Sequence, residues 1–168
     1  SRTEAIAQEI EGIRKVLKAV PGKAKLLLEN SAGGGDKIGA TIEDVARLFK
    51  GAASDRVKVC FDTAHAFEAG IITEYTLESV QKLFNAWDTA ISIENLAVIH
   101  ANDSKTEAGS HHDKHENISE GFIGIKGFRA LAAEKRLHDK VWLLEVPGFS
   151  DEGPDKKNVD LLRSCFGA

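Results

Sequence analysis

The chain is organised around residues 100–115, His100-Ala-Asn-Asp-Ser-Lys-Thr-Glu-Ala-Gly-Ser-His-His-Asp-Lys-His115. His100 closes an apolar run, and Asp113 and His115 end the polar loop that follows it. Asp113 and His115 are two positions apart, so an extended backbone points both side chains the same way. Imidazole and carboxylate groups are ligands that suit Zn²⁺ or Mn²⁺. The stretch therefore predicts a strand that ends in one metal ligand and a loop that brings back two more.

Short apolar runs alternate with helical patterns along the rest of the chain. The apolar runs predict strands at residues 24–28, 57–61, 96–99 and 141–144. Apolar residues at helical spacing predict helices at residues 3–20, 41–50, 76–87, 126–134 and 156–165. Continuous apolar runs are typical of buried parallel strands. The alternation predicts an α/β fold with a parallel sheet and right-handed crossovers.

A metal-capable side chain follows every predicted strand. In α/β folds the carboxyl ends of parallel strands meet at one rim, where active sites lie. His65 lies just beyond the second strand end, and the loop supplies its own two groups. Seven candidate ligands are therefore expected to converge on one face: Glu29, Asp62, His65, His100, Asp113, His115 and Glu145.

Each candidate also has a structural interpretation. Asp62 could cap the next helix, and a strand-end glutamate could form an ion pair. His100 alone could be a hydrogen-bonded core histidine. However, all four strand ends carry such groups in a chain with only six histidines. The joint pattern favours a metal site over separate structural roles.

Composition narrows the class of protein. With 168 residues and 42% hydrophobic content, the chain has enough apolar residues for one globular core. The net charge of −4 argues against nucleic-acid binding by bulk electrostatics alone. Bound metal ions can still reverse the sign of charge locally. Cys60 and Cys165 are too few for a disulfide framework, so both are expected as free thiols in a reducing compartment.

Six segments carry a family pattern, in order and with family-like spacing. They are Leu28-Glu-Asn-Ser-Ala-Gly33, Cys60-Phe-Asp-Thr-Ala-His-Ala-Phe-Glu-Ala-Gly70, His100-Ala-Asn-Asp-Ser-Lys105, Gly109-Ser-His-His-Asp-Lys-His-Glu116, Gly121-Phe-Ile-Gly124 and Leu144-Glu-Val-Pro147. In these segments the chain resembles the C-terminal half of endonuclease IV, the zinc-dependent apurinic/apyrimidinic endonuclease.

The resemblance implies a (β/α)₈ TIM-barrel type of fold, of which residues 1–168 hold about the last four βα units. A complete barrel of this kind needs eight strands and about 250 residues. We therefore expect one domain that lacks its first half. The open sheet edges would invite pairing with that missing half or with another chain.

The resemblance also implies three zinc ions in the complete barrel, with Mn²⁺ possible at one site. Glu29 would bridge two ions, and Asp62, His100 and Glu145 would complete the ligands of one of them. His65, Asp113 and His115 would hold the third ion. Glu29 and Glu145 would also be catalytic. Two further histidine ligands would belong to the first half of the barrel.

The implied activity is DNA repair. The family hydrolyses the phosphodiester on the 5′ side of an abasic site in double-stranded DNA and leaves a 3′-hydroxyl. No membrane partner is expected. The location would be cytoplasmic in a bacterium, and nuclear or mitochondrial in a eukaryote. The isolated half is expected to have little or no activity.

Two other functions stay open at this point. A sugar isomerase or epimerase of the xylose-isomerase-like barrels also uses four strand-end ligands, but around a single divalent ion. It has no need for His65, Asp113 and His115, so the number of bound ions separates the two enzymes. The third possibility is a non-catalytic barrel fragment that acts in assembly or binding.

Overall fold

Four parallel strands form the centre of the molecule. The computed structural model describes residues 1–167. Its main sheet has the order β1-β2-β3-β6, and every neighbouring pair is parallel. The strands are β1 (Leu26–Glu29), β2 (Val57–Asp62), β3 (Leu96–His100) and β6 (Val141–Leu143). This arrangement confirms the predicted parallel sheet, and each strand lies within about two residues of its predicted position.

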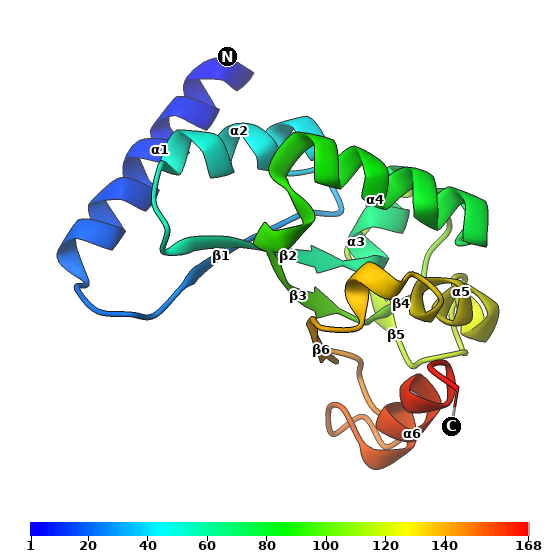
Figure 1. Ribbon diagram of the computed structural model, residues 1–168. Coiled ribbons are helices and arrows are strands. Elements are labelled where there is room, and N and C mark those ends of the chain that lie inside the picture. The colour runs from blue at the N-terminus through cyan, green and yellow to red at the C-terminus, as the bar shows by residue number, and fades with distance from the viewer. Residues whose placement is uncertain (168) are drawn as a thin grey trace.

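Five helices follow the predicted pattern. They are α1 (Arg2–Ala19), α2 (Ile42–Ala52), α4 (Leu77–Ile91), α5 (Gly124–Ala132) and α6 (Lys156–Ser164). Thr41 and Thr76 cap α2 and α4, each accepting a hydrogen bond from a backbone N–H in the first turn. α2 and α4 lie along the same side of the sheet, and α1 packs against α2 (Figure 1).

The core lies between β2 and the helices. Side chains alternate along a strand, so Val57, Val59 and Phe61 share one face of β2. Phe61 is fully buried and meets Phe84 and Trp87 of α4 edge to face, at centroid distances of 5.2 and 5.6 Å. Such edge-to-face pairs add to the stabilisation from burial. The alternate positions of β2, which include Asp62, therefore face away from this aromatic cluster.

Several short elements escaped the sequence analysis. The helix α3 (Thr63–Glu68) begins directly after β2, and β4 (Asp103–Ser104) pairs antiparallel with β5 (His115–Glu116). Two 3₁₀ turns, η1 (Ile93–Asn95) and η2 (Lys135–Leu137), precede β3 and β6. The long loop predicted after His100 is thus closed at its base by a short hairpin, in which each strand has two residues.

The outer strands leave apolar side chains in solvent. Leu27 of β1 is 37% exposed, and Val141 and Leu143 of β6 are 55% and 46% exposed. β1 and β6 each pair on one side only within residues 1–167. Among the same residues, no helix has both the length and the apolar character needed to cross a membrane.

Candidate metal centre

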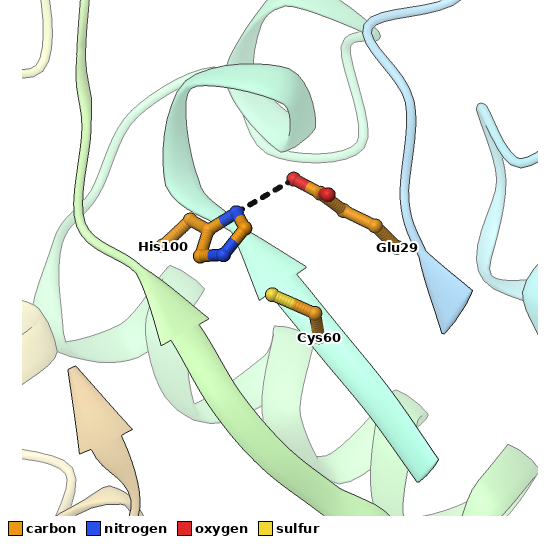
Figure 2. Close-up of side chains that lie close together, drawn as sticks. All are labelled: Glu29, Cys60 and His100. Atoms are coloured by element: carbon orange, nitrogen blue, oxygen red, sulfur yellow. Dashed lines mark hydrogen bonds and ion pairs between the residues drawn. The ribbon is translucent and has the colours of Figure 1, made fainter. Parts of the chain in front are cut away.

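The carboxyl ends of the four strands converge as predicted. The ring nitrogen Nδ1 of His100 lies 2.9 Å from Oε1 of Glu29 and 3.1 Å from Oε2 of Glu145. It lies 3.9 Å from Oδ2 of Asp62. These four residues can offer one ligand atom each within 4.8 Å of one another. Figure 2 shows Glu29 and His100 reaching toward each other across the end of β2, above the thiol of Cys60.

A second group lies beside the first. Nε2 of His65 is 3.2 Å from Oδ1 of Asp113 and 3.4 Å from Nε2 of His115. Nε2 of His115 is 3.8 Å from the same Asp113 oxygen and from Oδ2 of Asp62. The loop therefore returns both of its predicted ligand groups to the helix that carries His65. Asp62 lies between the two groups and belongs to both sets of neighbours.

The spacing of these atoms fits a zinc ion. Zinc bonds to nitrogen or oxygen of about 2.0–2.1 Å at tetrahedral angles put neighbouring ligand atoms roughly 3.3 Å apart. The three closest separations around His65, Asp113 and His115 are 3.2, 3.4 and 3.8 Å. Two imidazole nitrogens and a carboxylate oxygen at this spacing form a donor set that suits Zn²⁺.

The second nitrogen of each ring is also held as a metal site requires. Nδ1 of His65 lies 2.9 Å from the carbonyl oxygen of Asn30, and Nδ1 of His115 lies 3.3 Å from the carbonyl oxygen of Glu145. A ring that donates from Nδ1 keeps the lone pair of Nε2 for a cation. Both Nε2 atoms face the second group, and the backbone carbonyls fix the orientation of both rings.

The carboxylates and imidazoles at the rim shift each other's pKa values. Burial opposes ionisation of Glu29, but hydrogen bonds from His100 and His65 outweigh it and lower the pKa of Glu29 to about 2. Burial also disfavours the charged form of His65, yet Glu29 and Asp62 raise the pKa of His65 to about 10. Its bond to Glu29 raises the pKa of His100. Burial raises the pKa of Asp62, which has no exposed surface. Glu29 and the two histidines therefore favour each other's charged forms.

Two buried asparagines hold the rim together. The Asn30 side chain donates to the carbonyl of Asp62 (3.0 Å) and accepts from its N–H (2.8 Å). The Asn102 side chain donates to Oδ2 of Asp62 (2.6 Å) and accepts from the N–H of Glu145 (2.8 Å). Thr63 adds a bond to the carbonyl of Asn102 at 2.6 Å. These bonds tie neighbouring strand ends to each other and fix where the ligands point.

The sequence analysis did not single out these asparagines. Their signal was their position, because Asn30 directly follows Glu29 and Asn102 lies two residues after His100. Asp62 also caps the next helix, which was its alternative structural role. Its Oδ1 accepts the N–H of His65 at 2.7 Å, in the first turn of α3. Capping and metal binding are therefore compatible for this residue, because each uses a different carboxylate oxygen.

Other polar residues of the loop have structural surroundings. His111 bonds through Nδ1 to the carbonyl of Ala32 at 3.2 Å and lies against Gly33. Gly33 has φ of +81°, and a Cβ there would come within 2.8 Å of the His111 ring, so a larger residue does not fit. His112 is exposed, and Lys105 pairs with Glu116 at 3.6 Å. The loop at Gly33 thus lies next to the metal-ligand loop.

The fold and this rim define an α/β barrel-type protein with a candidate metal centre. The family model described as "Xylose isomerase-like TIM barrel" matches residues 1–165. A "Probable endonuclease 4" from Halothermothrix orenii is 39% identical over 155 residues, which are 92% of this chain and 55% of that protein. Another from a Thermotoga species is 36% identical over 167 residues, which are 98% of this chain and 57% of the relative.

A solved structure gives the same result. The crystal structure of endonuclease IV from Thermus thermophilus aligns with a TM-score of 0.77 and 35% identity, covering 93% of this chain and 55% of that one. The chain belongs to the endonuclease 4 family of xylose isomerase-like TIM barrels. It spans about half the length of the relatives it matches, so its fold is a partial TIM barrel.

Proposed function

We propose that the chain is the C-terminal half of a DNA repair endonuclease that hydrolyses the phosphodiester 5′ to an abasic site. Such an enzyme would act on double-stranded DNA and hold three zinc ions in its complete barrel. The observation that carries the proposal is the convergence of His65, Asp113 and His115 beside the four strand ends. A single-ion sugar isomerase has no use for this second group, which favours the nuclease.

Seven residues would hold the ions. Glu29, Asp62, His100 and Glu145 would hold ions at the strand ends, and His65, Asp113 and His115 would hold a further ion beside them. Bound zinc would lower the pKa of a water molecule and stabilise the attacking and leaving oxygens of the phosphodiester. Glu29 ends β1 and Glu145 follows β6, and both approach His100. Their carboxylates would be the groups that orient the attacking water.

The rest of the barrel would come from sequence outside residues 1–168. The exposed apolar side chains of β1 and β6 support this proposal, because an open parallel sheet edge can accept another strand. The half-length match to the relatives supports it as well. In a closed barrel, β1 and β6 would each gain a second neighbour, and Leu27, Val141 and Leu143 would be covered.

Cleavage of a labelled duplex with one abasic-site analogue tests the function. The chain is assayed with zinc, alone and together with the N-terminal half of a family member, and an undamaged duplex is the control. We expect cleavage 5′ to the lesion, with a 3′-hydroxyl product, only when both halves are present. Failure of the combined halves, with zinc bound and the halves associated, would support a non-catalytic fragment.

One substitution tests whether a side chain of the rim takes part in cleavage. Glu145→Gln keeps the shape of the side chain but removes its charge, so cleavage by the combined halves should be abolished. Glu152→Gln is the matched control, because Glu152 is exposed and lies outside the two ligand groups. Retained cleavage by Glu145→Gln would remove Glu145 from the mechanism. The number of zinc ions in the combined protein separates the nuclease from an isomerase, which needs only one.

A further inference from the structure

Glu68 is the one fully buried glutamate among residues 1–167, and the proposed chemistry does not use it. It lies at the end of α3, three residues after His65, so both side chains lie on the same side of this short helix. A charged side chain without exposed surface needs a reason, because burial in a protein interior opposes ionisation. The partners of Glu68 supply that reason.

Oε1 of Glu68 binds both arms of the hairpin that bears the metal-ligand loop. It accepts the hydroxyl of Ser104 on β4 at 2.7 Å and the backbone N–H of Lys114 at 3.2 Å. Lys114 is the residue between Asp113 and His115. Thr106 approaches the same oxygen at 3.5 Å. These bonds restrain the loop at the point where both ligands leave it.

The backbone of α3 also bonds to the same loop. The carbonyl of Glu68 accepts the N–H of His111 at 2.9 Å, and the carbonyl of Phe67 accepts the N–H of Gly109 at 3.0 Å. Between its paired ends at Lys105 and Lys114, the loop has no helix or strand of its own. Its shape therefore depends in part on contacts with α3, among which the Glu68 carboxylate bonds to the backbone N–H between the two ligand residues.

We propose that Glu68 is a positioning residue that fixes Asp113 and His115 against His65, so that α3 and the loop present the second ligand group as one rigid unit. The proposal rests on the metal centre proposed above. His65 and Glu68 share one short helix, so an anchor at Glu68 sets the distance of the loop from the His65 ring. The 3.2 Å and 3.4 Å separations around Nε2 of His65 follow from this anchor. Outer contacts of this kind change metal affinity about 10–100-fold.

Oε2 of Glu68 is buried and has no hydrogen-bond partner in the described part of the chain. A carboxylate that leaves one oxygen unpaired in the interior contributes little net stability, because the desolvation of that oxygen offsets its other bonds. If stability were the only requirement at this position, an apolar side chain would contribute more than a glutamate. This argues that the two bonds of Oε1 serve the geometry of the loop.

The test compares Glu68→Ala and Glu68→Gln with Glu78→Ala, an exposed glutamate of α4, as the control. Zinc titration of the whole chain is followed by the imidazole NMR signals, in which His65 and His115 report the second group and His100 reports the first. For Glu68→Ala we expect affinity at the second group to fall at least about tenfold, with the first group changed less than about threefold. Glu68→Gln keeps an acceptor oxygen for Lys114, so it should restore most of the affinity.

A second measurement does not need metal. Hydrogen exchange of the Lys114 N–H in zinc-free protein should accelerate at least about tenfold in Glu68→Ala and stay near the wild-type rate in Glu68→Gln and the control. Unchanged Lys114 exchange in Glu68→Ala would overturn the inference, as would equal loss at both ligand groups. A wild-type chain that binds no zinc would contradict the proposed metal centre, while the exchange of Lys114 would still decide the role of Glu68.

Discussion

Replacement of Asn102 by alanine should cost the chain a large part of its stability. Asn102 is fully buried, and its side chain makes one bond to the carboxylate of Asp62 and one to the N–H of Glu145. A hydrogen bond to a charged group contributes about 1.5–3 kcal/mol, and a neutral one about 0.5–1.5 kcal/mol. Alanine removes both bonds and leaves a buried carboxylate oxygen and a backbone donor without these partners. The free energy of unfolding should therefore fall by about 2–4 kcal/mol.

Urea unfolding of the zinc-free chain measures this loss. With a slope of about 2 kcal/mol per molar urea, the midpoint should shift down by about 1–2 M at unchanged slope. Asn85→Ala is the matched control, because Asn85 is exposed and its side chain accepts a surface bond from Arg136 at 3.0 Å. It should change the free energy of unfolding by less than about 0.5 kcal/mol. A loss below about 1 kcal/mol for Asn102→Ala would refute the idea that this amide holds the rim together.

Four further outcomes follow from the charges at the rim and from the two thiols. Zinc should raise the temperature of unfolding in a concentration-dependent way, and a chelator should reverse the effect; an unchanged midpoint would mean that the folded state has no preference for the ion. The raised pKa of His65, about 10, stabilises the zinc-free chain fully below its ordinary value of 6.5, so this contribution should fade as the pH rises from about 6.5 through 10. Zinc binding at pH 7 should accordingly release protons, which calorimetry in buffers of different ionisation heat detects. Burial raises the pKa of the Cys60 thiol, so iodoacetamide should modify half-buried Cys165 first, as the mass of the Cys165→Ser variant would show.

The strand ends could be predicted because two simple rules agree there. Apolar runs place the strands, and parallel strands bring their carboxyl ends to one rim. Glu29, Asp62 and His100 therefore came together from sequence alone, and the Asp-x-His spacing of the loop placed Asp113 and His115 on one side. None of these inferences needed a contact between distant residues to be known in advance.

The elements and residues that support the ligands cannot be predicted from strand positions and side-chain spacing. The α3 helix is six residues long and starts directly at the Asp62 cap, so it offers too few positions for a helical pattern. The β4–β5 hairpin has two residues in each strand. Glu68 looks like an ordinary exposed helix residue in the sequence. Its burial depends on Ser104 and Lys114, which lie 36 and 46 residues further along the chain.

The bonds that shape the rim come from within the chain, and this bears on what a half barrel can do. Asn30 ties Glu29's strand end to Asp62, and Asn102 ties Asp62 to Glu145, so the network reaches from β1 to the residues after β6. Closure of a barrel would cover the apolar edges, yet none of these bonds depends on it. In the proposed function, metal binding and DNA cleavage would therefore be separable. The ligand geometry rests on buried amides already present, whereas cleavage also needs a surface that holds the duplex in place.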